Sequence, residues 1–224
     1  MLCYKRKYIF ISIKQNFSRK RKGVMNRTIA KTGSIIVVLT VILFAIFMVT
    51  SKFASFLVCI FLALGYLMMI AGYHNESSDD RKVAANVGLI FGCIYAVLIL
   101  LVYFAQITAV RTDSLNEQAT MILDYSKGGL YFSYDLLGYG MMALSTFFIG
   151  LSIKLKNKKD KWLKYLMMIH GVFFFACLIM PMTGAFSSSM SEGTNSIGGI
   201  IALELWCAYF LPIGILSLFH FKND

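Results

Sequence analysis

The sequence predicts an all-α protein, a polytopic bundle of six transmembrane helices with both termini in the cytoplasm. Of its 224 residues, 58% are hydrophobic and only 15% are charged, whereas a soluble domain usually carries about 25% charged residues. The apolar residues form long runs, and lysine and arginine gather on one side of them. Hydrocarbon offers no water to the backbone, so a spanning chain must satisfy its own hydrogen bonds, as an α-helix does.

Six stretches approach the length of about 20 apolar residues that an α-helix needs to cross the bilayer core. Between the first two, Ser51 and Lys52 form the only break. One helix over both stretches would be about 60 Å long, which is twice the thickness of the core. We therefore expect a tight hairpin with Lys52 at its turn. The six predicted spans are residues 33–50, 53–73, 84–110, 129–153, 165–184 and 197–219.

Lysine and arginine are distributed unequally between the two sides of the predicted bundle. Only Lys52, Arg111 and Lys127, of 22 such residues, fall on one side. The others lie in residues 1–32, in the loops after the second and fourth spans, and in the tail. Basic loops stay in the cytoplasm during membrane insertion, so both termini are expected there. The same distribution supports an even number of spans.

The chain divides into a basic cytoplasmic segment (residues 1–32), a six-helix transmembrane domain (residues 33–219) and a short cytoplasmic tail (residues 220–224). The loops between spans are too short to form a domain, so any chemistry must occur inside the bundle or at its rims. Basic loops account for the net charge of +11, so nucleic acid is not an expected partner. The expected partner is the lipid bilayer of the plasma membrane.

Motifs of enzymes and of metal sites are absent from the sequence. The HExxH, Walker and GxSxG motifs do not occur. The five cysteines show no CxxC spacing, and four of them lie inside apolar runs. We therefore predict no enzyme activity, no cofactor, no metal site and no disulfide framework.

Asp135, His170 and Glu204 are the ionisable residues well inside the predicted spans. Such residues cost several kcal/mol unless they are paired, protonated or hydrated, so they are the best candidates for a functional site. Asp135 and Glu204 lie about 9 Å and about 10 Å below the outer ends of their helices. On neighbouring helices, two carboxyls at this similar depth would share a proton or a cation. Alternatively, each is protonated and bonded to a neighbouring helix, or reaches water near the outer rim.

His170 lies in the cytoplasmic half of the fifth span, where it either relays protons or is a neutral residue bonded to a neighbouring helix. On the fourth span, Tyr131 and Tyr134 fall near the same face as Asp135 by the i, i+3, i+4 rule. This polar stripe predicts that Asp135 points into the bundle, with the two tyrosines in the same ion-binding site. The glycines assigned to close helix packing are Gly88, Gly92, Gly138 and Gly140.

Part of the second half of the chain resembles a known group of proteins. The segment YDLLGYGMMALST (residues 134–146), the lysine-rich turn after it and MIHG (residues 168–171) are similar to those of uncharacterised bacterial small multi-pass membrane proteins. The resemblance implies a six-span membrane protein of a bacterial cell and assigns no activity.

Two functions are consistent with these residues. The first is a small ion- or proton-coupled transporter that uses the intramembrane acids; six spans are few for a transporter, so it would act as a homodimer or with a partner membrane subunit. The second is a non-catalytic sensor, regulator or partner subunit that works through helix contacts. Ligand-dependent flux supports the first, whereas co-purification of a stoichiometric partner supports the second.

Residues 1–24 have two interpretations: a polybasic segment that binds anionic lipid, or the translation of DNA that precedes a true start at Met25. We favour the start at Met25, because Arg21-Lys22-Gly23-Val24 is what purine-rich ribosome-binding DNA would encode. The mass of the natively expressed protein is then expected to match a chain that begins at Met25. Peptides from residues 1–24 in that protein would contradict this expectation.

Overall fold

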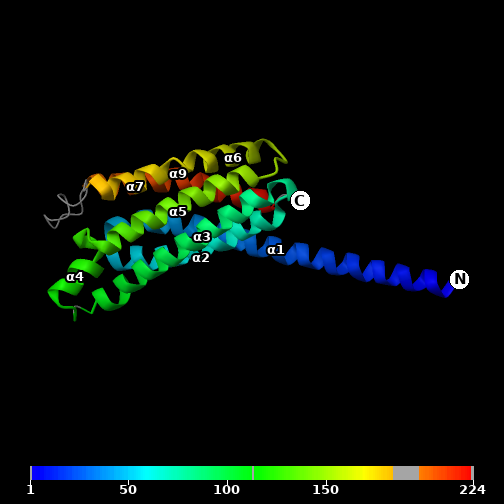
Figure 1. Cartoon of the computed structure of the whole chain (residues 1–224), viewed down its shortest axis with the longest axis horizontal. Helices are drawn as coiled ribbons and strands as arrows, with labels where there is room; N and C mark the ends of the chain where they lie inside the picture. The colour runs from blue at the N-terminus through cyan, green and yellow to red at the C-terminus, as the bar shows by residue number, and fades with distance from the viewer. Residues whose placement is uncertain (1, 113, 184–196, 223–224) are drawn as a thin grey trace.

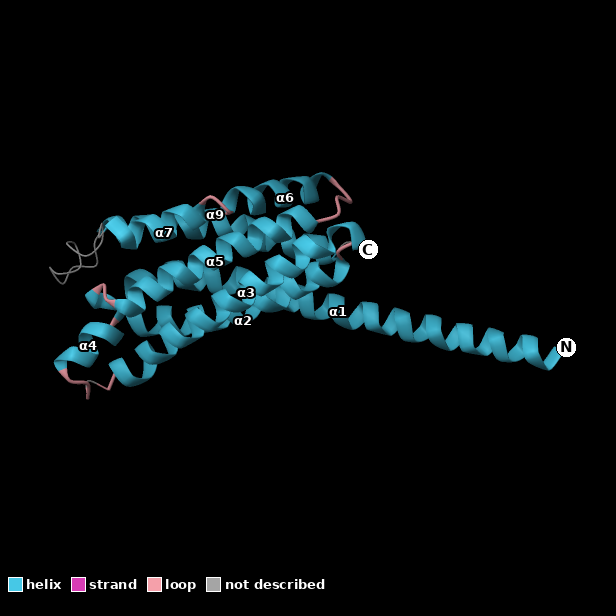
Figure 2. Ribbon diagram, viewed as in Figure 1, coloured by secondary structure: helices cyan, strands magenta, loops and turns pink. Residues whose placement is uncertain are grey.

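The computed structural model describes residues 2–112, 114–183 and 197–222. These residues form helices and no strands (Figure 2). The elements are α1 (Leu2–Thr50), α2 (Lys52–Glu76), η1 (Asp79–Arg81), α3 (Lys82–Ala105), η2 (Gln106–Val110), α4 (Glu117–Leu123), η3 (Tyr125–Lys127), α5 (Leu130–Ser152), α6 (Lys158–His170), α7 (Phe173–Thr183) and α9 (Ile197–Lys222). Among the described residues, six helical segments are long and apolar enough to cross a membrane, so this is a multi-pass membrane protein.

The six apolar segments confirm the six predicted spans, with ends that differ by several residues. They are Val24–Thr50, Lys52–Glu76, Asp79–Val110, Leu130–Ser152, Lys158–Thr183 and Gly198–Lys222. The predicted break after the first span is present, because Ser51 separates α1 from α2 and its Oγ accepts a hydrogen bond from the Ala54 amide at 3.4 Å. Figure 1 shows that α1 also extends far beyond the bundle toward the N-terminus.

The fifth span is two helices, α6 and α7, where the sequence predicted one. At the junction, the amides of Gly171 and Val172 bond to carbonyls three residues earlier, at 3.2 and 3.0 Å. These tighter turns replace the α-helical pattern. Gly171 also packs so closely on Phe147 that an added Cβ would lie 2.9 Å from the Phe147 Cβ. Close packing on α5 thus accompanies an interruption that hydropathy does not reveal.

The spans pack as a closed ring in the order α1, α2, α3, α5, α6 with α7, and α9, which returns to α1. Both termini lie at one end of the bundle, together with the turn between α5 and α6 (Figure 1). This end carries the lysines of residues 154–164, and we name it the basic end. The opposite end, which carries α4, is named the loop end.

Five aromatic side chains from four helices fill the centre of the ring, and we name them the aromatic cycle. Tyr66 of α2 contacts Tyr95 of α3, with ring centroids 5.3 Å apart. From Tyr95 the contacts continue to Tyr139 of α5 at 5.9 Å and then to Trp206 of α9 at 5.2 Å. Trp206 stacks on Phe210 at 5.0 Å, and Phe210 returns to Tyr66 at 6.3 Å. Each such contact contributes about 0.5–1.5 kcal/mol beyond its burial.

Glycines permit the closest helix approaches. A Cβ added at Gly88 of α3 would lie 2.9 Å from Ile149 Cγ1 of α5, and one at Gly92 would overlap Ile70 of α2. Gly138 faces Ile99 of α3, whereas Gly140 faces α7. All four glycines of the predicted packing set therefore lie at helix contacts.

A close approach of two spans on backbone atoms lies between α1 and α2, and it generates a stability prediction. A Cβ at Gly33 would lie 2.6 Å from both the Met69 amide nitrogen and the Met68 Cβ. Gly33→Ala should therefore destabilise the protein by about 1–3 kcal/mol, the usual effect of overpacking. The measurement is thermal unfolding in detergent.

Gly198→Ala is the matched control, because no atom of the described residues lies within 4 Å of a Cβ added at Gly198. Alanine favours a helix by about 0.5–1 kcal/mol over glycine, so the control should be neutral or slightly stabilised. Equal unfolding temperatures for the two variants would contradict the close α1–α2 contact.

Candidate functional site

Asp135 of α5 is an acid buried in the bundle, and the site is built around it. Its side chain is 2% exposed, and its Oδ1 atom has no hydrogen-bond partner among the described residues. The phenols of Tyr103 and Tyr125 are the hydroxyl groups placed to donate to this carboxyl. An ionised carboxylate left without a counter-charge in hydrocarbon is costly. A bound proton or cation removes that cost.

The groups around Asp135 come from four elements, and we name them the Asp135 cluster. Tyr103 is on α3, Tyr125 is on η3, Cys59 is on α2 and Tyr139 is one turn along α5. The Cys59 Sγ lies 3.8 Å from the Tyr139 hydroxyl. Tyr139 also belongs to the aromatic cycle, so the cluster lies directly against the centre of the bundle.

The loop between α3 and α5 covers the Asp135 cluster from the loop end, and Gln106 holds it there. The Gln106 side-chain amide donates to the Leu123 carbonyl at 2.7 Å and accepts from the Tyr125 amide at 3.0 Å. Gln106 is 4% exposed and begins a π-helical segment, η2; such segments often occur at functional sites. Gly128, at φ 66°, then reverses the chain toward α5 in a conformation that favours glycine.

Tyr125 lies outside the spans and closes the cluster as a neutral hydrogen-bond donor. Burial, together with the nearby charge of Asp135, raises the pKa of the Tyr125 phenol well above its usual range. Its ring packs on Phe56 at 5.9 Å and on Phe132 at 5.2 Å. The phenol is therefore held in place and keeps its proton.

Hydroxyl groups continue from the cluster toward the middle of the bundle. The Tyr95 hydroxyl is buried without a hydrogen-bond partner among the described residues. The Tyr66 hydroxyl donates to the Met142 carbonyl at 3.4 Å, and Ser145 Oγ donates to the Gly88 carbonyl at 2.6 Å. These groups form an interior track of polar atoms between α2, α3 and α5.

The structure does not bring Glu204 to Asp135. Asp135 lies within electrostatic range of Cys59 and Cys177. Glu204 is half-buried on α9 and lies within electrostatic range of Cys207 instead. No hydrogen bond or ion pair joins the two acids within the described part of the chain. The similar depth predicted for the two acids fixes their height in the bundle but not the direction in which each points.

The predicted tyrosines also lie apart from the carboxyl. Tyr131 and Tyr134 are both half-buried and pack on each other with ring centroids 6.2 Å apart. Tyr131 lines an apolar groove beside Leu100 and Phe104 of α3. The phenols that face Asp135 are instead Tyr103 and Tyr125, which come from a different helix and a loop.

His170 is buried with a partner on each ring nitrogen. The Trp206 indole N–H donates to Nε2 at 3.2 Å, and Nδ1 lies 2.7 Å from Thr146 Oγ1. Because an indole nitrogen only donates, Nε2 is the acceptor and the remaining ring proton is on Nδ1. His170 is thus a neutral link between α5, α6 and α9.

Sequence reasoning missed Tyr103, Tyr125 and Gln106. Tyr103 lies inside an apolar span and Tyr125 lies in a loop, so neither stood out. Gln106 is the one signal available, since it is an amide in the predicted third span. A second cluster, of Glu76, His220 and Asp160 at the basic end, was missed as well.

Comparisons with models of known families, with curated proteins and with solved structures find no match. Within residues 2–112, 114–183 and 197–222, no group of three or more His, Cys, Asp or Glu side chains is arranged to hold a metal ion.

The Gln106 contacts predict how the loop end is closed. Gln106→Ala removes the side-chain partners of the part-buried Tyr125 amide and Leu123 carbonyl, a loss of up to about 1–3 kcal/mol per unsatisfied group. Hydrogen exchange of residues 123–128 should therefore accelerate while the spans stay protected. Gln118→Ala is the control, because Gln118 is exposed on α4 and should leave exchange unchanged. Unaltered exchange in Gln106→Ala would show that other contacts hold the loop.

Proposed function

We propose that this protein is a small proton-coupled transporter of a bacterial plasma membrane, in which Asp135 binds the proton. The observation that carries the proposal is the buried Asp135 carboxyl, whose Oδ1 has no hydrogen-bond partner within the described residues. Intramembrane carboxyls of this kind mark ion pathways and proton relays. The basic end, which carries most of the lysine and arginine, would face the cytoplasm.

A proton suits this site better than a metal cation. Hard cations such as Mg²⁺ and Ca²⁺ are held by six or more oxygen ligands. The neighbours of Asp135 offer two phenols and the thiol of Cys59, which is a poor set of oxygen donors. A proton needs only the carboxyl itself.

A transporter must open its site to each side of the membrane in turn. At the loop end the closure is local: η3 carries Tyr125 over the carboxyl, and Gln106 fastens it through two hydrogen bonds. Release of these two bonds and of the packing of the Tyr125 ring on Phe56 and Phe132 would expose Asp135 to the loop end without moving a span. Toward the basic end, the aromatic cycle closes the path.

The second candidate function, a sensor, regulator or partner subunit, is favoured by one feature. None of the described residues of α7 is buried, and Phe175 and Met182 are 60% and 78% exposed. Such a face meets lipid in a monomer, or it meets a second copy or a partner membrane subunit. A transporter of six spans would use the same face for a homodimer.

The proposal predicts a pH-dependent stability that depends on Asp135. A proton on Asp135 stabilises the fold, so unfolding temperature should fall by several degrees as the pH is raised from about 6 to about 9. Asp135→Asn keeps the shape but cannot ionise, so it should remove this part of the fall. In proteoliposomes with a pH-sensitive dye, the wild type should dissipate an imposed pH gradient in the presence of its solute, and Asp135→Asn should not.

Glu204→Gln is the control, because the sequence predicts a similar depth for Glu204 on α9 and the structure keeps it separate from the Asp135 cluster. It should keep both the pH response and the flux. The proposal fails if Asp135→Asn matches the wild type in both assays, or if a panel of small solutes and monovalent cations produces no flux above empty liposomes. If Na⁺ stabilises the wild type and Asp135→Asn abolishes this effect, then the ion bound at Asp135 is sodium and not a proton.

A further inference from the structure

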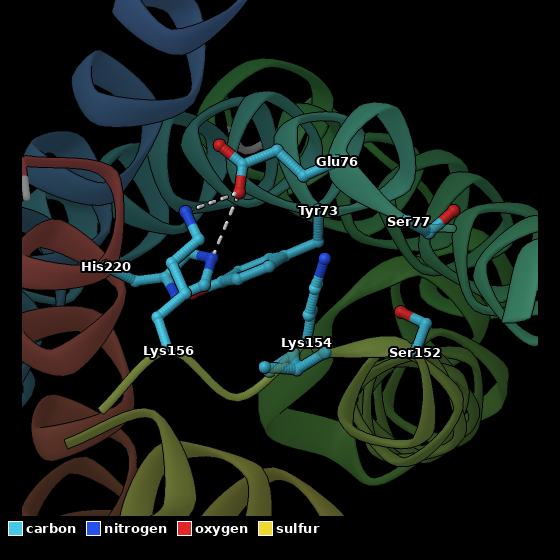
Figure 3. A pocket seen from close by; sticks show the side chains of 8 residues that line it. Tyr73, Glu76, Ser77, Ser152, Lys154, Lys156 and His220 are labelled. Atoms are coloured by element: carbon cyan, nitrogen blue, oxygen red, sulfur yellow. Dashed lines mark hydrogen bonds and ion pairs between the residues drawn. The ribbon is translucent and has the colours of Figure 1, made fainter. Parts of the chain in front are cut away.

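A histidine between two carboxylates lies at the basic end, far along α9 from the aromatic cycle. His220 Nδ1 lies 2.8 Å from Asp160 Oδ1, and Nε2 lies 3.2 Å from Glu76 Oε2. The side chains of His220 and Asp160 are 3% and 1% exposed, and that of Glu76 is 24% exposed. Figure 3 shows Glu76 and His220 facing each other across the end of the bundle. The three residues join α2, α6 and α9.

The chemistry of the three groups requires an extra proton. An ionised carboxylate only accepts hydrogen bonds, and a neutral imidazole has one N–H to donate. Both contacts are hydrogen bonds only when the ring carries two protons or when one carboxyl is protonated. In either form, the trio has bound one proton more than a neutral histidine and two carboxylates hold.

Basic side chains and a backbone amide also contact the two acids, and one of them shares Glu76 Oε2 with His220. Lys156 Nζ lies 3.4 Å from Glu76 Oε2 and Arg27 Nε lies 3.9 Å from Glu76 Oε1. The Lys156 amide donates to Asp160 Oδ2 at 2.9 Å. The acids are therefore fixed in place by α1 and by the turn before α6.

The other polar and charged groups near the trio come from α2, the turn before α6, α6 and α9. Tyr73 of α2 packs on the His220 ring at 5.2 Å. Lys154 lines a small pocket beside His220, and Lys159 lies 4.2 Å from the Phe219 ring centroid. Lys222 is the next charged residue along α9. The pocket, which Ser77 and Ser152 also line (Figure 3), gives water and protons a route to the site.

We propose that Glu76, Asp160 and His220 form a proton-binding site at the basic end, and that the bound proton holds the last turn of α9 against α2 and α6. Loss of the proton leaves an imidazole lone pair facing a carboxylate oxygen, so one attractive contact becomes repulsive. That turn also packs Phe221 on Tyr73, with ring centroids 4.6 Å apart. The site is independent of Asp135, and it exists whether or not the protein transports anything.

Nuclear magnetic resonance of the full chain with ¹⁵N-labelled histidine tests the proton directly. At about pH 7.5, where a free histidine is mostly neutral, one of the three histidines should show both ring nitrogens protonated. His220→Gln should delete that signal, whereas His74→Gln should not, because His74 bonds to Asn86 at 2.6 Å instead.

Unfolding temperature provides the second readout, measured in the Asp135→Asn background so that the other acid does not contribute. It should fall by several degrees between about pH 6 and about pH 9, and this fall should vanish in His220→Gln. Asp160→Asn should also abolish the fall without unfolding the protein. The new amide can donate to Nδ1 while its oxygen still accepts from Lys156, so a neutral histidine satisfies both contacts.

These two readouts separate the outcomes. His220 could give the spectrum of a neutral ring while His220→Gln still removes the fall of unfolding temperature with pH. That result would place the extra proton on a carboxyl and would support the proton-binding site. A neutral signal combined with a flat pH response, or a response that survives in both His220→Gln and Asp160→Asn, would overturn the proposal.

Discussion

The constraint on which this structure depends is that polar atoms inside a membrane bundle must find partners within the protein. Most of the hydroxyls in the spans meet it locally, as Ser34 and Thr40 do by donating to carbonyls one turn earlier at 2.9 and 2.7 Å. Larger polar groups cannot bond to their own helix in this way, so their hydrogen bonds are made to other helices or loops. His170 joins three helices in this way, and Gln106 ties a loop to the end of a span. The arrangement of the ring of helices is thus set largely by a few polar side chains and by the glycines that let helices approach.

Among the described residues, the hydroxyls of Tyr73 and Tyr95 and Oδ1 of Asp135 are buried without a hydrogen-bond partner. Asp135 differs from the two tyrosines because an unpaired carboxyl can bind or release a proton. An apolar residue at this position would not leave an unpaired carboxyl oxygen in the bundle. The surrounding phenols can donate to the carboxyl, but they do not supply the positive charge that an ion pair would. The proton that we propose on Asp135 would remove the cost of this unpaired acid, whereas in the trio around His220 the histidine faces both carboxylates at the basic end.

The sequence was sufficient for the features that depend on one helix at a time. Hydropathy predicted six spans, helix length predicted the break at Ser51, and helical periodicity predicted the inward direction of Asp135. Each of these depends on residues close together in the chain. The partners of Asp135 depend on how helices rotate against one another, which depth and periodicity along one span do not specify. Glu204 shows this, since its depth matched that of Asp135 while its helix packs on α1 and α6. Tyr125 could not be predicted either, since a loop carries it back into the bundle.

The two titratable sites lie on opposite sides of the aromatic cycle, and α9 connects them. This helix contributes Trp206 and Phe210 to the cycle, and at its end it carries His220. Any exchange of protons between Asp135 and the basic end must open the cycle, because its members are buried and in mutual contact. A shift of α9 would separate Trp206 from Tyr139 and would also strain the contacts of His220 with α2 and α6. The proton held at His220 therefore stabilises the closed cycle, and its release weakens one of the anchors that keep α9 in the closed position.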